Sequence, residues 1–280
     1  MLFDTLTILG VGLLGGSLGL AAKSRGLVRR VVGVGRDAAR LREALAAGQL
    51  DESTTDLAAG VRIADLVVVC TPVDLIPQQV RELAEVAKAG CLVTDVGSTK
   101  SEIVARLRDP LPNRVTFIGS HPMAGSEKKG SNHATPDLFQ GRVTIITPTA
   151  DTPPRASQAI HEFWERIGCR VVTMTPEEHD RAVALVSHLP HAVAAALAGV
   201  VDPALLCVSA GGFRDTTRIA SASAAIWEPI FRTNRREVLA SCAAFAERFD
   251  EFRRLLEAED GPGLIHWLNE GKRVRDALGS

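Results

Sequence analysis

Residues 7–21 of the chain, TILGVGLLGGSLGLA, decide its fold. The segment begins in an apolar run typical of a buried strand, passes through a glycine-rich turn and ends in small and apolar residues typical of a helix. The turn carries the pattern G-x-G-x-x-G, in which glycine permits a tight turn, a close approach of a pyrophosphate and close packing of the helix behind it. The N-terminus of that helix would face the phosphates, so the segment predicts dinucleotide binding. The residues expected to contact the cofactor here are Gly10, Gly12, Leu13, Leu14 and Gly15.

The second predicted strand, RVVGVG, ends at Gly35, where an NAD-binding fold places a carboxylate for the ribose. Arg36 follows instead, and an arginine at this place can pair with the 2'-phosphate of NADP. Asp37, one residue later, keeps NAD open as the cofactor. The sequence thus favours NADP over NAD, with a merely solvated Arg36 as the alternative.

Predicted strands alternate with helices of about 10 to 15 residues as far as the run CRVVTM, which predicts a doubly wound, Rossmann-like parallel α/β sheet. After about Pro176 the residue pattern changes to Ala, Leu and Val at helical spacing, which predicts an all-α second half. We therefore expect a dinucleotide-binding domain over residues 1–174 and a helical domain over residues 175–280. Within the helical half, Pro190 predicts a kink, and residues 233–258 predict one long amphipathic helix.

The composition narrows the class of partner. The chain has 280 residues, 46% of them apolar, and a formal net charge of -1, so it offers no basic surface for nucleic acid or an anionic membrane. Its five cysteines are an odd number and never occur as C-x-x-C, which indicates buried thiols in a reducing cytoplasm, without disulfides or a metal site. Residues 5–22 are uncharged but rich in glycine, which argues against a signal peptide or a membrane helix. We expect a small-molecule substrate.

Three further segments end predicted strands at the edge where a doubly wound sheet receives ligands. Thr71 and Pro72 end one strand and are expected to contact the cofactor, with a simple strand stop as the alternative. The segment DVGSTK carries Ser98 at the end of another. The segment GSHPMAGSEK places His121 on what reads as a glycine-bounded loop after a third. A histidine whose pKa is near neutral pH is suited to take the proton of an alcohol while hydride leaves the carbon that bears the hydroxyl. Ser98 and His121 are therefore the candidate catalytic residues, with Ser98 also near the cofactor.

The helical half carries two polar clusters. His188 and His191 in SHLPH are three residues apart on one helical face, a spacing that suits a metal, but no carboxylate or cysteine nearby completes a site. Core or capping histidines are the alternative. Arg214 and Arg218 in GGFRDTTRIA are four apart, so both can face one way, and a guanidinium in a cleft is the usual fork for a carboxylate. Two solvated arginines are the alternative there.

Together these motifs resemble the prephenate and arogenate dehydrogenase family of tyrosine biosynthesis. The resemblance runs along nearly the whole chain and rests on six segments in the family's order: GVGLLGGSLGLA, TPV, DVGSTK, GSHPMAGSEKKG, SHLPH and GGFRDTTRIA. It implies that His121 accepts a hydrogen bond from the ring hydroxyl of the substrate and that Ser98 lies beside it and the nicotinamide. It implies further that His191 lines the substrate pocket and that Arg218 binds a substrate carboxylate. It also implies a homodimer formed through the helical domain.

The reaction implied by the resemblance is an oxidative decarboxylation of prephenate or arogenate, which gives 4-hydroxyphenylpyruvate or tyrosine. It needs a base, a hydride acceptor and recognition of two carboxylates, but no metal. The missing acidic residue after the second strand departs from the NAD pattern and leaves the cofactor open. The length leaves no room for the regulatory or mutase domains of some relatives, so we expect a bare catalytic core.

Two other classes stay open from the residues alone. A β-hydroxyacid dehydrogenase or an imine reductase shares a Rossmann half and a helical half, but would use a helical-domain lysine or another glycine motif. A regulator that only senses a dinucleotide would not need Ser98, His121 and Arg218 together.

Overall fold

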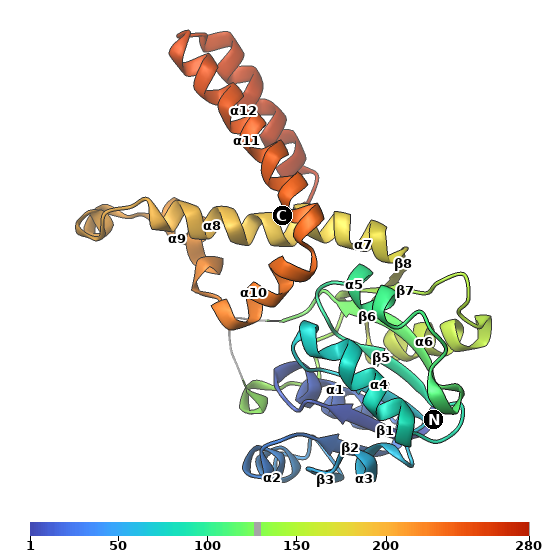
Figure 1. Ribbon diagram of the computed structural model, residues 1–280. Coiled ribbons are helices and arrows are strands. Elements are labelled where there is room, and N and C mark those ends of the chain that lie inside the picture. Colours follow the sequence, from blue (N-terminus) through green and yellow to red (C-terminus); the bar gives the residue numbers. More distant parts are fainter. Residues whose placement is uncertain (126–129, 280) are drawn as a thin grey trace. The chain divides into compact units, whose positions relative to one another are not determined.

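The centre of the structure is an eight-stranded sheet in the order β3-β2-β1-β4-β5-β6-β7-β8 (Figure 1). The computed structural model describes residues 1–125 and 130–279. Neighbouring strands run parallel except β6 and β7, which are antiparallel. The strand order reverses between β1 and β4, which is where doubly wound sheets bind ligands. The strands are β1 (Phe3–Leu9), β2 (Val28–Val34), β3 (Glu52–Thr54), β4 (Leu66–Val69), β5 (Leu92–Asp95), β6 (Thr116–Pro122), β7 (Val143–Thr147) and β8 (Arg170–Thr173).

Helices cover both faces of the sheet, because successive strand residues point to opposite sides and both sides are apolar. One face packs on α1, α2 and α6 in a core that includes Leu18 and Trp164. The other packs on α3, α4 and α5 in a core that includes Ile76 and Leu83. The doubly wound α/β domain expected from the sequence is thereby confirmed. Its helices are α1 (Leu13–Ser24), α2 (Ala38–Ala46), α3 (Leu57–Val61), α4 (Ile76–Val86), α5 (Ser101–Arg106) and α6 (Pro154–Ile167).

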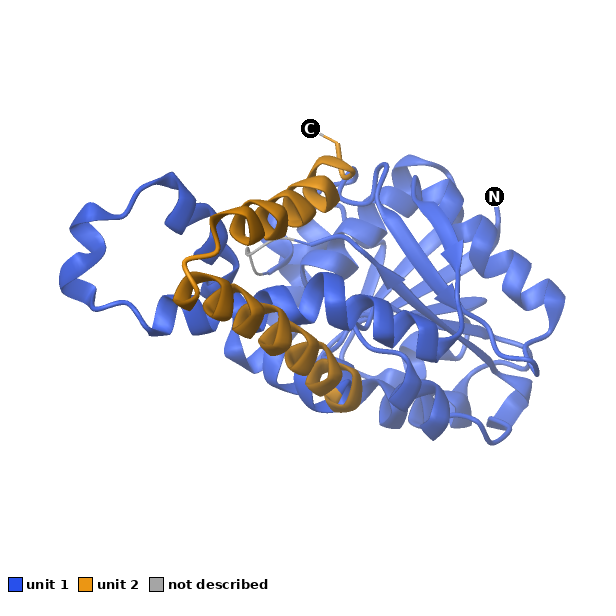
Figure 2. Cartoon of the chain, turned by 90° about the horizontal axis from the view of Figure 1, so that it is seen from above, with its two compact units in different colours: residues 1–234 blue, residues 235–280 orange. Residues whose placement is uncertain are grey.

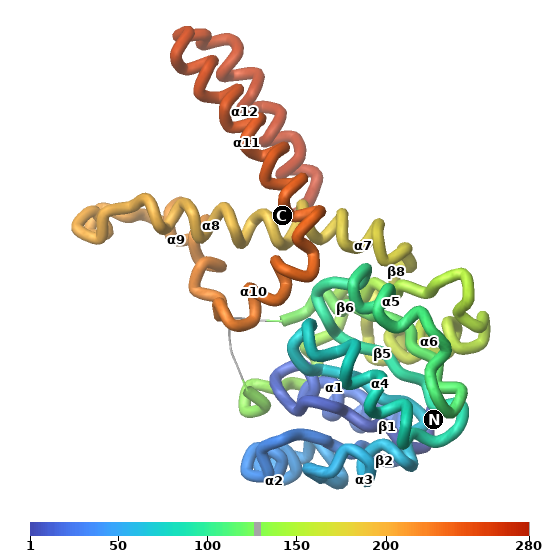
Figure 3. The backbone as a smooth tube through the Cα atoms, viewed as in Figure 1, coloured from blue at the N-terminus to red at the C-terminus, as the bar shows by residue number. Residues whose placement is uncertain are grey.

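After β8 the described chain is helical, as expected, beginning with one continuous run that Figure 3 traces from yellow to gold. The run consists of α7 (Pro176–Val183), a π-helical turn (Ala184–His188) and α8 (Leu189–Gly199). Pro190 has no N–H for the carbonyl four residues back, and the N–H of Leu189 bonds the carbonyl of Ala184, five residues back. The irregularity expected at Pro190 thus takes the form of a π turn just before it. α9 (Gly211–Thr217), the 3-10 turn η6 (Arg218–Ser221) and α10 (Ala224–Thr233) follow.

By compactness the chain divides into two units, residues 1–234 and 235–280, coloured separately in Figure 2. The second unit is a hairpin of two helices, α11 (Arg235–Glu257) and α12 (Gly261–Asp276). Within it, the Arg248 guanidinium lies 4.7 Å from the centre of the Trp267 ring and pairs with Glu270 at 2.7 Å. This division by compactness falls at residue 234 and does not test the domain boundary expected between residues 174 and 175, which stays a prediction.

One helical run, Pro176–Gly199, is long and apolar enough to cross a membrane by length and composition alone. Core helices of soluble proteins pass the same test. Three polar side chains of this run, those of His179, Asp180 and His188, are buried in the fold and hydrogen-bonded there. The run is therefore weak support for a membrane span.

Candidate active site

The glycine turn between β1 and α1 has the geometry that a dinucleotide needs. Gly10 has a φ of +99°, and a Cβ there would meet Thr71 Cγ2, beyond the end of β4, at 2.9 Å. A Cβ on Gly15 would meet the carbonyl oxygen of Gly10 at 2.3 Å, so the helix can start this close to the turn only with glycine there. A Cβ on Gly12 would meet nothing within 4 Å, which leaves space in front of the turn. These residues fit a pyrophosphate.

The N-terminus of α1 completes this cradle. Its N-cap is Gly12, and among the described residues no side chain caps it, so the first N–H groups face the open space. Thr71 and Pro72 lie just beyond β4, where the Thr71 hydroxyl bonds Gln79. The predicted cofactor contacts at positions 10–15 and 71–72 therefore gather at one edge of the sheet.

The turn after β2 carries Arg36 and Asp37, the two charged residues that the sequence offers for the ribose of the cofactor. The carboxylate of Asp37 accepts hydrogen bonds from the N–H groups of Ala39 and Arg40, at 2.9 and 3.2 Å, and so caps α2. Arg36 is exposed at the tip of the same turn. Asp37 thus caps α2, and its carboxylate and the Arg36 guanidinium are both exposed to solvent.

A hollow of about 390 Å³ lies within the first compact unit and brings together four of the predicted site residues. The rest of its lining is largely apolar, so it suits a small organic molecule with few charged groups. Its lining residues are Ser98, His121, Pro122, Met123, Ala124, Gly125, Ser187, His191, Arg218, Ile219, Ala222 and Trp227. The last part of the predicted motif, residues 126–129, lies outside the described residues.

Ser98 is held in place by a buried ion pair in the turn after β5. The Asp95 carboxylate accepts hydrogen bonds from the N–H of Gly97 at 2.8 Å and of Ser120 at 2.9 Å, and it pairs with the Lys100 ammonium. Asp95 and Lys100 are both fully buried. Because both ends of the DVGSTK turn are anchored to one carboxylate, the position of Ser98 between them is defined.

The structure corrects the expectation that His121 lies on a loop. β6 continues to Pro122 because β7 runs antiparallel beside it, and His121 pairs with Ile145 of β7. Its side chain is 7% exposed. Burial, and then the neighbouring His179, Lys100 and His188, lower the pKa of His121 well below its ordinary value. His121 is therefore a neutral imidazole at neutral pH, on a rigid strand at the wall of the hollow.

Two residues that the sequence analysis missed lie directly behind His121. Its Nδ1 is 2.8 Å from Nε2 of His179, and Nδ1 of His179 is 2.8 Å from Oδ1 of Asp180. Burial lowers the pKa of His179. Burial alone would raise the pKa of Asp180, but hydrogen bonds from His179 and from two backbone N–H groups outweigh it and the net pKa is lowered. The residues T-P-E-E before them form a capping box at the start of α7, and no sequence motif singled out the pair.

The two histidines of SHLPH have different surroundings. His188 is fully buried, with Nδ1 3.2 Å from Nδ2 of Asn234. His191 stacks on Trp227, with ring centres 3.6 Å apart and planes at 27°. Burial lowers the pKa of His191, and the charge of Arg218 lowers it further. His191 and Trp227 thus form a flat aromatic wall of the hollow, while His188 lies behind it.

The two arginines of GGFRDTTRIA are also separated. Both are exposed, but Arg218 begins the 3-10 turn η6 and lines the hollow, whereas Arg214 lies on α9 and is not among the lining residues. The change from α to 3-10 winding between them breaks the four-residue spacing that would place both on one face. The structure therefore does not bring Arg214 to the candidate site.

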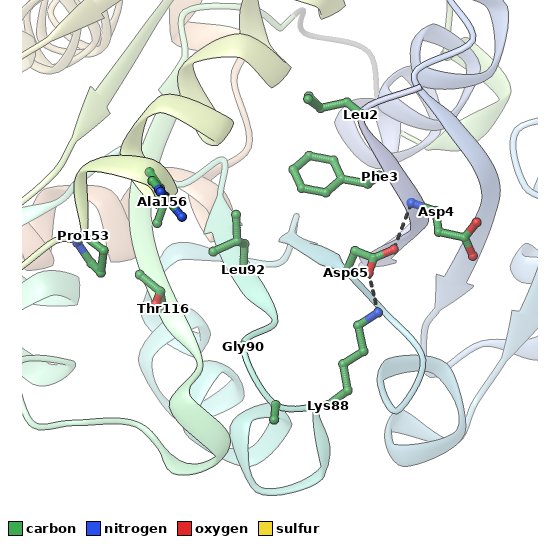
Figure 4. Close-up of a pocket in the computed structure, with 12 residues that line it drawn as sticks. Leu2, Phe3, Asp4, Asp65, Lys88, Gly90, Leu92, Thr116, Pro153 and Ala156 are labelled. Atoms are coloured by element: carbon green, nitrogen blue, oxygen red, sulfur yellow. Dashed lines mark hydrogen bonds and ion pairs between the residues drawn. The ribbon is translucent and has the colours of Figure 1, made fainter.

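A second hollow, of about 590 Å³, lies at the amino-terminal side of β1, β4 and β5 (Figure 4). In it the Asp65 carboxylate accepts hydrogen bonds from the backbone N–H groups of Asp4 and Thr5, both at 2.9 Å, and pairs with the ammonium group of Lys88. Asp65 is thus engaged in tying β1 to the loop before β5. This hollow lies at the amino-terminal ends of the strands, whereas the glycine turn lies at their carboxyl ends. Open α/β sheets bind their ligands at the carboxyl ends.

Comparison with known proteins agrees with this arrangement. A family model described as "Prephenate dehydrogenase, nucleotide-binding domain" matches residues 18–173, and one described as "Prephenate dehydrogenase, dimerization domain" matches residues 175–270. The chain is 36% identical over 285 residues to prephenate dehydrogenase of Bacillus subtilis, covering 98% of this chain and 76% of that protein.

Two solved structures are similar over nearly the whole chain. Prephenate dehydrogenase from A. aeolicus in complex with hydroxyphenyl propionate and NAD+ superposes with a TM-score of 0.91 at 31% identity, covering 98% of each chain. Synechocystis arogenate dehydrogenase superposes with a TM-score of 0.82 at 29% identity, covering 98% of this chain and 99% of that one. A glycine turn shaped for a dinucleotide, a histidine-lined hollow at the same edge and these matches lead to one assignment: the chain belongs to the prephenate dehydrogenase family.

Proposed function

We propose that this protein catalyses the oxidative decarboxylation of prephenate, arogenate or both, with transfer of hydride to a nicotinamide dinucleotide. The observation that carries the proposal is the hollow in which His121 and Ser98, from strand ends of the sheet, meet Arg218 and His191, from the helical segment. A buried neutral base and a guanidinium in one small hollow, whose lining is both polar and apolar, suit a substrate with a ring hydroxyl and carboxylates.

The chemistry follows from these residues. Nε2 of His121 accepts the proton of the C4 hydroxyl while hydride leaves C4, which becomes a ketone. The nicotinamide, when bound, accepts that hydride. The ketone is conjugated to C1, so the bond from C1 to its carboxylate breaks, carbon dioxide leaves and the electron pair moves through the ring to the oxygen. The proton on His121 can return to that oxygen, and the ring is then a phenol.

Ser98 and Arg218 position the substrate for this step. Ser98 sits on a turn anchored by the buried Asp95–Lys100 pair and can hydrogen-bond the same hydroxyl from the cofactor side. Arg218 holds a carboxylate of the substrate at the helical side of the hollow. The stacked rings of His191 and Trp227 form the wall against which the substrate ring packs.

The cofactor is NADP in preference to NAD. Support comes from the turn after β2, where Asp37 caps α2 and Arg36 is exposed beside the place of the ribose. A guanidinium there pairs with a 2'-phosphate, which only NADP carries. A ribose hydroxyl of NAD would find no carboxylate in that turn other than the one that already caps the helix.

The protein forms a homodimer through its helical residues. Its dinucleotide-binding domain comprises residues 1–174 and its helical domain residues 175–280. It acts in the cytoplasm. Support for the dimer comes from apolar side chains that are exposed in a single chain, because exposed apolar surface often marks a contact with another protein. The five cysteines are all free, in keeping with a reducing compartment, but they are not all buried as expected, since Cys207 is exposed. The exposed apolar side chains of the α7–α8 run include Leu185, Val186 and Leu197, with Val200 just after it, and those of the α11–α12 hairpin include Phe245, Phe249, Leu256 and Ile265.

Steady-state kinetics with prephenate and arogenate, each with NAD and NADP, test this function. The reduced nicotinamide is followed by absorbance, and the aromatic product and carbon dioxide are measured to confirm one of each per turnover. We expect turnover in at least one combination, with the larger kcat/KM for NADP. No turnover in any of the four combinations, with a folded protein that still binds a dinucleotide, would refute the proposal.

A further inference from the structure

Three side chains form a continuous hydrogen-bonded row away from the hollow, from His121 on β6 to His179 and Asp180 on α7. The two contacts are 2.8 Å each, between Nδ1 of His121 and Nε2 of His179 and between Nδ1 of His179 and Oδ1 of Asp180. The three residues are 7%, 0% and 2% exposed. The rings of the two histidines meet edge to face, with centres 5.1 Å apart and planes at 63°. Such a row leaves few ways to place its protons.

The protons follow from what each atom can do. An ionised carboxylate only accepts, so Nδ1 of His179 carries its proton and donates to Asp180. The neutral ring of His179 then has its lone pair on Nε2, which accepts from His121. Nδ1 of His121 must therefore carry the proton, and its Nε2, the atom left for the hollow, has the free lone pair. A base that takes a proton from a substrate needs this tautomer.

Asp180 is itself fixed from three directions. Its Oδ1 accepts from the backbone N–H of Lys100 at 2.7 Å and its Oδ2 from that of Ser101 at 2.9 Å. Its backbone carbonyl accepts from the side chain of Asn234 at 2.8 Å. The carboxylate cannot rotate away without breaking the bonds from Lys100 and Ser101, so it fixes the orientation of the His179 ring.

We propose that His179, held by Asp180, is a positioning residue that fixes the tautomer and orientation of His121 for proton transfer. The inference rests on the proposed function, because it assumes that His121 is the base. His179 does not line the hollow, so it acts only through His121. When His121 takes the proton, the row also disperses the new charge toward Asp180.

Other charged and titratable groups surround the row, and they must be considered when the pH profile of a His179 variant is interpreted. On the β5–α5 side, the charge of the Lys100 ammonium lowers the pKa of both rings, and that ammonium is paired with Asp95. On the helical side, the charge of His188 lowers the pKa of His121, and that of His179 lowers the pKa of His188. All of these groups stay in place when His179 alone is replaced, so a changed pH profile would report on His121.

Four proteins test the proposal: the wild type, His179→Leu, His179→Gln and Val183→Ala. Leucine removes the acceptor for Nδ1 of His121, while glutamine can offer its amide oxygen at nearly the same place. Val183 is a buried apolar residue of the same helix outside the row, so its truncation serves as the control for loss of stability. Folding is checked by circular dichroism and thermal melting before any kinetic comparison.

The first measurement does not depend on turnover. In ¹⁵N-labelled wild type, NMR should show a protonated, pyrrole-type Nδ1 and an unprotonated, pyridine-type Nε2 for His121 at pH 8. In His179→Leu the ring should lose this preference. A wild type whose His121 carries its proton on Nε2 would overturn the proposal. Absence of turnover in the wild type would refute the proposed function instead, and the NMR result would still decide the tautomer.

The kinetic measurement separates positioning from mere packing. We expect His179→Leu to lower kcat by about 10² fold or more, with KM for substrate and cofactor changed by less than about 3-fold, since no binding contact is lost. His179→Gln should recover at least about tenfold of that loss. The acid limb of the kcat–pH profile should move in His179→Leu and not in Val183→Ala. If His179→Leu lowers kcat no more than Val183→Ala does, or if the pH profile is unmoved, His179 has only a packing role.

Discussion

His188 should make the folded protein lose stability in mild acid. Its side chain is fully buried and lies edge-on to the rings of Trp227 and Phe231, with centres 5.9 and 6.5 Å away. Burial, with smaller effects of neighbouring histidines, lowers its pKa to about 4, although Asp180 and the carbonyl of Ser98 act in the opposite sense. In the unfolded chain the same ring titrates near its ordinary value of about 6.5.

The sign follows from the proton count in each state. Between pH 6.5 and about 4 the unfolded chain binds a proton at His188 and the folded chain does not, so acid favours unfolding. From the two pKa values, the free energy of unfolding should fall by about 2 kcal/mol between pH 7.5 and pH 5.0 through this residue. Below about pH 4 both states are protonated and the loss through His188 stops growing.

Urea unfolding at fixed protein concentration, at pH 7.5, 6.5, 5.5 and 5.0, measures this loss in the wild type and in His188→Gln. The burial-lowered pKa values of His121 and His179 add to the acid sensitivity of both proteins, so the difference between the two pH dependences isolates His188. The glutamine variant should be less stable at pH 7.5 but lose about 2 kcal/mol less on going to pH 5.0. Parallel pH dependences in the two proteins would show that His188 is not a buried neutral histidine.

Four further predictions bear on the proposed function. His121→Asn should lower kcat by about 10² to 10⁴ fold with dinucleotide affinity little changed, and collapse of cofactor binding with kcat intact would make His121 structural. Arg218→Gln should raise the substrate KM by about 30-fold or more while Arg214→Gln leaves it nearly unchanged, and the reverse pattern in steady-state kinetics would exchange their roles. Arg36→Ala should weaken NADP binding by about 2 kcal/mol and leave NAD binding nearly unaltered, whereas equal losses in a titration with both cofactors would exclude pairing with the 2'-phosphate. Gly15→Ala should abolish dinucleotide binding, since its Cβ would lie 2.3 Å from a backbone oxygen of the turn, and retained binding by calorimetry would mean that the turn can shift.

Much of the fold could be predicted from the sequence because its signals are local. The glycine turn, the apolar strands and the helices between them follow from spacing within about 15 residues. The antiparallel pairing of β6 with β7 does not, since it joins segments separated by a long connection and neither run marks its direction. For that reason His121 was expected on a loop and is instead on a strand.

The site divides in the same way. Ser98, His121, His191 and Arg218 could be named because each lies in a short motif whose residue types suggest chemistry, and the hollow brings all four together. Arg214 was named on helical spacing, which fails where α9 passes into a 3-10 turn. Trp227 and the His179–Asp180 pair carry no motif, and their part in the site appears only in contacts between segments far apart in the chain.

Those contacts also explain why the first compact unit, residues 1–234, extends beyond the point where the residue pattern becomes helical. The pattern changes near Pro176, yet Asp180, four residues later, accepts two backbone hydrogen bonds from the start of α5. Asn234, the last residue of the compact unit, donates to the Asp180 carbonyl and lies 3.2 Å from His188. The helical segment from α7 to α10 is therefore bonded to the sheet through the same residues that orient His121. A substitution that loosens α7 from α5 should then reduce turnover before it reduces cofactor binding, because the glycine turn takes no part in these contacts.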